Sequence, residues 1–276
     1  MTFSEGMARG PVAMLEGAPR CFASGANTGT SPGRMACPSS PRRPRAAPTA
    51  RMERAGHGPE LIAQNVALLR SLAQGGPMCV GGLMGCRGDA YTGEGALPRQ
   101  EARAFHRWQA EAFRRAGADF LLAGILPTAP EAQGMAETGL PYVLSLTLRR
   151  DGRLVDGTRL CDLIRETDAL LGEGRPAFYM SNCIHPDAVR AALDQAFNRC
   201  GAVRARFLGV QANTSPRSFA ELDGADALQG DAPEPWAEAM LRLHRAHPMR
   251  LLGGCCGTDG RHMAALAARL TAEAGN

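Results

Sequence analysis

From residue 59 onward, the apolar positions follow two patterns that alternate along the chain. Segments with apolar residues three or four positions apart, each ended by glycine or a polar run, predict helices. Between them stand short continuous apolar runs, which are typical of strands that a parallel sheet buries on both faces. The predicted helices span residues 59–73, 100–116, 130–138, 160–171, 186–199, 234–247 and 259–274. The predicted strands span residues 78–84, 119–125, 142–148, 177–181, 207–211 and 250–252.

This strict alternation predicts an α/β fold, namely a (β/α)8 TIM-type barrel. An open doubly wound sheet is disfavoured, because no G-x-G-x-x-G stands at a strand-to-helix turn. A closed barrel needs two strands more than the six found after residue 59. The only candidates are Val12–Leu15 and the neighbourhood of Ala46–Ala50. We therefore expect the first two βα units to be incomplete or degenerate.

The segment 18–50 differs from the rest of the chain. It is rich in Pro, Gly, Ser, Ala and Arg, and its apolar residues show no period. The prolines at 32, 38, 41, 44 and 48 exclude a long helix there, so the segment is predicted to be loop or disordered. The chain accordingly divides into an irregular N-terminal segment, residues 1–58, which is a remnant of the first βα units, and a barrel, residues 59–276.

Composition narrows the class of protein. Of the 276 residues, 45% are hydrophobic and 21% are charged, which suits one large globular domain. All 31 basic residues are Arg, and their excess lies in residues 1–58, so the nearly neutral remainder argues against a nucleic-acid partner. No apolar run reaches the length of a membrane span, and we expect neither a span nor a secretory signal. Assembly into a homo-oligomer stays open.

The chain has nine cysteines. An odd number in a chain of this size argues against a disulfide framework and for the reducing cytoplasm. Two of them stand together in Gly253-Gly254-Cys255-Cys256-Gly257, where a predicted strand passes into a helix. Neighbouring strand residues point to opposite faces, so two adjacent cysteines share an ion only where glycines let the chain turn. Two buried small side chains and a vicinal disulfide are the alternatives.

A third cysteine, Cys183, follows the predicted strand 177–181 and precedes a helix that begins at Pro186. It lies, like Cys255 and Cys256, at the carboxyl end of a strand, and in a barrel all these ends share one face. Three converging thiolates leave one tetrahedral position open, which is the pattern of catalytic zinc. For His185, a helix-capping role or exposure to solvent is favoured over a fourth ligand.

These cysteine elements, Asn182-Cys183 and Gly253 to Gly257, resemble the zinc signature of the homocysteine S-methyltransferase family. The similarity extends over about residues 59–272, with weaker matches in 80–85, 88–90, 116–122, 141–147, 156–158 and 211–214. The resemblance implies a (β/α)8 barrel and methyl transfer to a thiol. It also implies a zinc ion (Zn²⁺) held by Cys183, Cys255 and Cys256.

The resemblance further implies substrate-binding positions. Glu16 and Gly17 stand nearest to the Asp-Gly-Gly with which family members hold the amino-acid head, and Asn182 and Asn213 lie in matching motifs. Gly124 stands where the family has a Glu that pairs with the substrate ammonium. Because a lost charged hydrogen bond costs roughly 1.5–3 kcal/mol of binding, we expect weak activity with homocysteine.

The leading hypothesis is a cytoplasmic enzyme of methionine biosynthesis, a zinc-dependent S-methyltransferase. It would move a methyl group from an onium donor to homocysteine or a related thiol, giving methionine. Betaine, S-methylmethionine and S-adenosylmethionine all remain open as donors. The alternative is a catalytically silent zinc-binding barrel of the same family with a binding or structural role. A redox protein that uses Cys255 and Cys256 is a third, weaker hypothesis.

Overall fold

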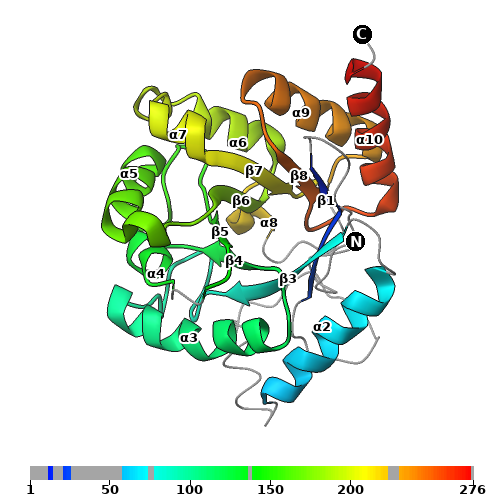
Figure 1. Ribbon diagram of the computed structural model, residues 1–276. Helices are drawn as coiled ribbons and strands as arrows, with labels where there is room; N and C mark the ends of the chain where they lie inside the picture. Colours follow the sequence, from blue (N-terminus) through cyan, green and yellow to red (C-terminus); the bar gives the residue numbers. More distant parts are fainter. Residues whose placement is uncertain are drawn as a thin grey trace.

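A ring of strands surrounded by helices makes up the protein (Figure 1). The structure is a computed structural model, and it describes residues 12–14, 21–25, 58–73, 78–135, 139–222 and 230–274. The strands are β1 (Val12–Met14), β2 (Cys21–Gly25), β3 (Met78–Gly85), β4 (Phe120–Leu126), β5 (Tyr142–Leu146), β6 (Phe178–Ile184), β7 (Phe207–Ala212) and β8 (Leu251–Gly254). The longer helices are α2 (Pro59–Ala73), α3 (Arg99–Arg115), α5 (Leu160–Leu171), α6 (Pro186–Leu193), α9 (Pro233–Ala246) and α10 (Gly260–Ala274). Shorter ones are α4 (Ala129–Gln133), α7 (Gly201–Arg206), α8 (Phe219–Leu222), and the 3-10 turns η1 (Gly172–Gly174) and η2 (Ala196–Asn198).

The strands pair in chain order from β1 to β8, and β8 pairs back to β1. The six strands β3 to β8 form the expected curled parallel sheet, and β2 adds to it in parallel. β1 departs from the (β/α)8 pattern, because it runs antiparallel to both β2 and β8. The reason lies in the chain: only residues 15–20 separate β1 from β2, whereas a parallel crossover needs a dozen residues or more.

β2 corrects a second expectation. Its residues Cys21–Gly25 lie in the segment predicted to be loop or disordered, yet they pair in register with β3, from Cys21 beside Met78 to Gly25 beside Gly82. Two strands of the ring thus come from the segment 1–58. The other proposed strand, Ala46–Ala50, and the rest of the segment 18–50 lie outside the described residues.

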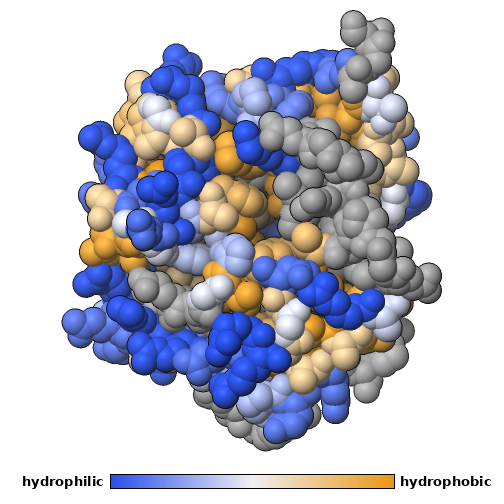
Figure 2. Space-filling view, in the orientation of Figure 1, coloured by the Kyte–Doolittle hydropathy of each residue, from blue (hydrophilic) through white to orange (hydrophobic). Residues whose placement is uncertain are grey.

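Two apolar layers follow from the alternation of side chains along the strands. The inner layer fills the ring with Leu83, Leu122, Val143, Met180 and Leu251. Outward-facing strand residues pack against the helices in a second, larger cluster. In the view of Figure 2, hydrophilic residues occupy much of the rim and apolar residues gather near the middle of the ring. An apolar cavity of about 240 Å³ lies at the amino-terminal ends of β4, β5 and β6.

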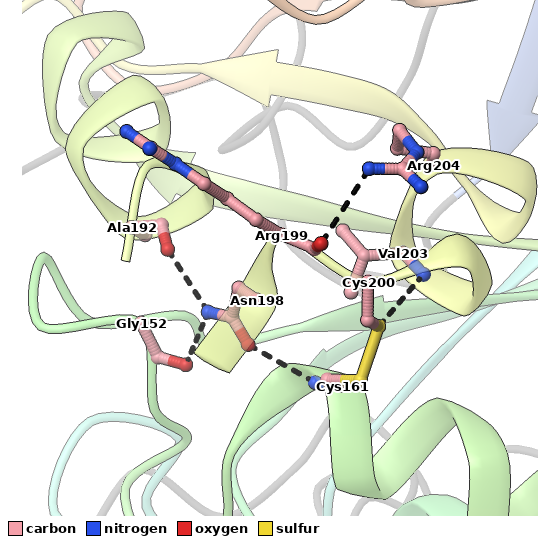
Figure 3. Close-up of a disulfide and its surroundings, with 8 residues drawn as sticks. All are labelled: Gly152, Cys161, Ala192, Asn198, Arg199, Cys200, Val203 and Arg204. Atoms are coloured by element: carbon pink, nitrogen blue, oxygen red, sulfur yellow. Dashed lines mark hydrogen bonds between the residues drawn. A yellow bond between two sulfur atoms is a disulfide. The ribbon is translucent and has the colours of Figure 1, made fainter. Parts of the chain in front are cut away.

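The predicted helix 186–199 is divided into α6 and the turn η2, and α7 and α8 were not predicted. The buried Asn198 explains the division. Its side chain donates hydrogen bonds to the carbonyl oxygens of Gly152 and Ala192 and accepts one from Cys161 N (Figure 3). Such contacts compete with helical hydrogen bonding.

A disulfide joins Cys161 on α5 to Cys200, which caps α7 (Figure 3). The cysteine count predicted thiols without a disulfide framework, so this pair is a departure from expectation. The two residues lie 39 positions apart in the sequence, and only the packing of α5 against α7 brings them together.

Among the described helices, none is both long and apolar enough to cross a membrane.

Candidate metal centre

The ends of β6 and β8 bring three cysteines together. The Sγ atom of Cys183 lies 2.7 Å from that of Cys255 and 3.7 Å from that of Cys256. All three sulfurs lie within 4.8 Å of one another. Cys183 is the second-to-last residue of β6, and the other two directly follow β8. The convergence predicted from strand ends is therefore present in the structure.

The backbone turns sharply at Cys183. Its φ of 56° lies in the left-handed region, which non-glycine residues seldom occupy and which costs of order 1–3 kcal/mol. Asn213 holds this turn, because its Nδ2 donates to the carbonyl oxygen of Cys183 at 3.3 Å. The side chain of Cys183 thereby leaves the regular alternation of β6 and meets the two cysteines that follow β8.

The turn after β8 is equally fixed. Cys255 N donates to Ala212 O at 2.7 Å, and the hydroxyl of Thr258 donates to Cys255 O, also at 2.7 Å. Thr214 N donates to Cys256 O at 3.1 Å. Gly257 then takes a φ of 81°, where a Cβ atom would collide with the side chain of Thr214. The adjacent cysteines are thus held by main-chain contacts from two neighbouring segments.

Hydrogen bonds among the three sulfurs change the pKa of each thiol. Hydrogen bonds from Cys255 and Cys256 hold the pKa of Cys183 well below its usual range. The hydrogen bond to Cys183 raises the pKa of Cys255, and the same cause raises that of Cys256. Of the three thiols, Cys183 is therefore the most acidic.

This donor set fits a zinc ion. Sulfurs at the usual zinc–sulfur distance of about 2.3 Å in a tetrahedron lie roughly 3.8 Å apart. The Cys183–Cys256 separation of 3.7 Å matches this spacing, and the shorter Cys183–Cys255 separation would open as an ion entered. Three protein sulfurs with an open fourth position are the pattern of a catalytic rather than a structural site.

The residues expected to bind substrate differ in their positions and contacts. Asn182 is buried beneath the centre, where its Oδ1 accepts hydrogen bonds from Ser145 Oγ at 2.6 Å and from Ile125 N at 3.1 Å. Its Nδ2 has no protein partner among the described residues. Asn213 fixes the backbone of Cys183, as described above. Glu16 and Gly17 lie outside the described residues.

His185 caps α6, which is one of the two expected roles, and it is buried rather than exposed to solvent. Its Nδ1 accepts from Asp187 N at 3.3 Å, and its Nε2 lies 3.1 Å from Asp231 Oδ2. Both ring nitrogens are therefore engaged away from the sulfurs, and His185 is not one of the residues grouped around the candidate metal position.

Gly124 lies on β4 beside the inner layer. A Cβ atom added there would meet Leu83 Cδ1 at 3.1 Å, so Leu83 occupies the space next to this position. The neighbouring Ile125 has a φ of 56°, which is rare for a β-branched residue, and Asn182 holds its N–H.

Sequence reasoning missed one residue of the centre. Tyr91 lies in the loop after β3, and its ring stacks on that of Phe219 of α8. The negative charge of Cys183, followed by burial, raises the pKa of this phenol. The available signal was an aromatic residue in a glycine-rich loop at the carboxyl end of a barrel strand, where active-site groups concentrate.

Fold and site together define an α/β protein with three cysteine sulfurs gathered at the carboxyl ends of its strands. The sequence model of the homocysteine S-methyltransferase family matches residues 40–270, and the chain belongs to this family.

Named relatives agree with this assignment. The chain is 30% identical over 216 residues to the homocysteine S-methyltransferase of Escherichia coli (strain K12), a match that covers 74% of this chain and 66%, just under two thirds, of that protein. The crystal structure of the homocysteine methyltransferase MmuM from Escherichia coli in its metallated form matches with a TM-score of 0.65 at 26% identity. That match covers 90% of this chain and 79% of MmuM. The oxidized form of MmuM matches over the same shares with a TM-score of 0.62 at 26% identity.

Proposed function

We propose that the protein is a zinc-dependent S-methyltransferase. It would transfer a methyl group from an onium donor to the thiol of homocysteine or a related thiol, giving methionine in the case of homocysteine. The observation that carries the proposal is the trio Cys183, Cys255 and Cys256, whose sulfurs lie within 4.8 Å of one another. Family membership supports the same reaction, and the metallated relative supports a metal at this kind of site.

The chemistry needs a thiolate, because a free thiol has a pKa near 8.5 and is mostly protonated at neutral pH. Zinc held by the three cysteines would lower the pKa of an acceptor thiol in the open fourth position and keep it ionised. The reaction moves a carbon atom between heteroatoms, so no general base has to approach the methyl group.

The chain's own residues supply position. Asn213 and Thr258 fix the backbones of Cys183 and Cys255, which sets where the sulfurs point. Beneath them, Asn182 offers an amide Nδ2 that has no protein partner in the described part of the chain. A buried unpaired donor is costly, so this amide is suited to donate a hydrogen bond to a polar group of the substrate.

The decisive experiment measures metal content and methyl transfer on the same preparations. The purified protein should carry close to one zinc per chain, and Cys255→Ser and Cys256→Ser should lose most of it. Cys79→Ser is the matched control, because Cys79 lines the cavity at the opposite end of the strands and should leave zinc unchanged.

Methyl transfer is then assayed with a panel of thiols and with sulfonium and quaternary ammonium donors. Turnover that disappears with the zinc supports the enzyme. Full zinc content without turnover for any pair would support the catalytically silent barrel instead. Full zinc content in the Cys255→Ser, Cys256→Ser double variant would overturn the proposed metal centre.

A further inference from the structure

The cavity at the amino-terminal ends of the strands lies at the opposite end of the sheet from the three sulfurs. Its volume is about 240 Å³. Buried side chains of the inner layer form its walls, namely Leu122, Val143, Met180 and Leu251. Ala177 at its mouth is exposed, so the cavity opens to solvent at that end. An apolar protein cavity of about 150 Å³ binds benzene, and this cavity therefore has room for a larger ring system.

The space follows from glycines at inward-facing positions of the strands. The interior of a closed α/β barrel is ordinarily filled by bulky side chains. A Cβ atom added to Gly209 would lie 3.2 Å from the Cβ atoms of both Met180 and Leu251, so this glycine stands in the inner layer and contributes no side chain to it. On β3, Gly81 likewise contributes none, and a Cβ atom there would collide with the ring of Phe120. The inner layer is thus incomplete at the end of the ring that holds the cavity.

One buried polar group borders the cavity. Gln211 of β7 is 5% exposed, and its Oε1 has no hydrogen-bond partner among the described residues. A buried acceptor without a donor is costly, so a bound molecule with an N–H or O–H group would be favoured here. Asp119 is the charged residue of the lining, but its Oδ1 pairs with Arg70 Nη2 at 2.6 Å and its Oδ2 accepts from Val80 N at 2.6 Å. The cavity therefore suits a neutral molecule.

We propose that this cavity is a binding site for a small neutral aromatic molecule that carries one N–H or O–H group. The ring would lie among the apolar side chains, and its N–H or O–H would donate to Gln211 Oε1. The partly buried rings of Phe120 and Phe178 line the same cavity and offer the aromatic contacts that such a molecule prefers. The proposal does not rest on the metal centre or on methyl transfer.

Indole is the probe, because it combines a fused aromatic ring system with a single N–H group. Benzofuran is the matched ligand, since it has nearly the same shape with an oxygen atom in place of the N–H. Calorimetric titration of the native protein should give one indole per chain with a dissociation constant below about 1 mM. Benzofuran should bind about fivefold more weakly, the usual net effect of one hydrogen bond. Gln211→Met should bind the two ligands equally.

A second comparison locates the ligand. Val143→Phe puts a larger side chain into the cavity, so it should abolish indole binding and raise the melting temperature, as filling a cavity commonly does. Cys255→Ser is the control at the other end of the strands, and it should bind indole as the native protein does. If Val143→Phe does not fold, Ala177→Trp at the exposed mouth provides the second test and should weaken indole binding.

Three results would overturn the proposal. The first is a native protein that does not bind indole at millimolar concentration. The second is native affinity for indole in folded Val143→Phe or Ala177→Trp, and the third is loss of indole binding in Cys255→Ser, which would assign the ligand to the metal centre. Equal native affinities for indole and benzofuran would overturn the role of Gln211. Zinc content, measured on the same preparations, distinguishes each of these results from a failure of the proposed function.

Discussion

At the scale of single residues, His106 on α3 is the clearest case of an ionisable side chain whose burial opposes its protonation. The side chain is fully buried, and neither ring nitrogen makes a hydrogen bond within the described part of the chain. Its Nε2 lies 3.9 Å from Oε1 of the buried Glu131, beyond hydrogen-bonding distance. Burial lowers the pKa of His106 to about 4, and burial raises that of Glu131.

These shifts predict a stability that depends on pH. Between pH 6.5, where the unfolded histidine takes up a proton, and about pH 4, the folded protein leaves His106 neutral. The free energy of unfolding should therefore fall on acidification through this window, by up to about 1 kcal/mol per pH unit. His106→Leu should flatten this fall. Denaturant unfolding of both proteins from pH 7.5 to 4.5 measures the difference.

Glu131 acts in the opposite direction above pH 4.5, because its raised pKa lets the folded protein take up a proton before the unfolded chain does. Glu131 is present in both native protein and His106→Leu, so the difference between the two curves reports on His106. Parallel curves for the two proteins would show that His106 is not the group responsible.

Gly124 leads to a prediction about substrate choice. The family resemblance implies a glutamate at this position, whose carboxylate pairs with the substrate ammonium. A glutamate at 124 would restore that carboxylate, but its Cβ would lie only 3.1 Å from Leu83 Cδ1. We therefore expect Gly124→Glu combined with Leu83→Ala to raise kcat/KM for homocysteine by about tenfold, since one charged contact corresponds to at least roughly 1.4 kcal/mol.

Gly124→Gln with Leu83→Ala is the control, because it has nearly the same size without the charge. An equal rise in both double variants would assign the effect to shape. If kcat/KM for homocysteine rose in neither double variant, homocysteine would be removed from the proposed acceptors. The proposed metal centre would not be affected by that result.

At the scale of elements, the turn after β8 combines two constraints at Gly257, a positive φ of 81° and a close approach to Thr214. Gly257→Ala should therefore displace Cys256 and lower zinc affinity, with a loss of stability of about 1–3 kcal/mol. Zinc titration against a chelating dye and thermal unfolding measure the two effects.

Two other glycines separate the two causes. Gly117 has a φ of 83° and nothing within 4 Å of a Cβ, so Gly117→Ala tests the backbone conformation alone. Gly201 has an ordinary φ and equally open space, so Gly201→Ala should be neutral. Native zinc affinity in Gly257→Ala would mean that this turn does not set the position of the sulfurs.

The disulfide between α5 and α7 leads to a further prediction for an element. It closes a loop of 39 residues that contains β6 and Cys183. Cross-links of this length typically stabilise a protein by about 2–4 kcal/mol, chiefly by restricting the unfolded chain. A reductant should lower the melting temperature of the native protein by several degrees. Cys161→Ser should melt at the lower temperature and no longer respond to reductant, and a native protein that does not respond would contradict the cross-link in solution.

At the scale of the whole molecule, the sequence predicted what repeats regularly and missed what depends on contacts between distant segments. The longer helices and the six strands β3 to β8 were readable because burial imposes a period of about 3.6 or a continuous apolar run. β2 was missed, because Cys21–Gly25 is short, rich in small residues and set among prolines and glycines. The antiparallel direction of β1 could not be read from three apolar residues.

The candidate site shows the same division. Cys183, Cys255 and Cys256 were predictable, since each stands at the end of a recognisable strand. Tyr91 and the Cys161–Cys200 disulfide were not, because a loop and the packing of two helices place them, and neither leaves a pattern in the neighbouring residues.

The pairing of β1 with β8 also determines when, during synthesis, the ring of strands can close. Ala13 pairs with Leu252, so the ring cannot close until β8 has left the ribosome. Contacts between such distant residues are slow to form, because the chain must first pay the entropy of a long loop. Cys255 and Cys256 leave the ribosome directly after β8. A nascent chain arrested before residue 251 would therefore hold one of the three sulfurs and an open sheet edge, and the proposed metal centre would form only after β8 and the two cysteines that follow it have emerged.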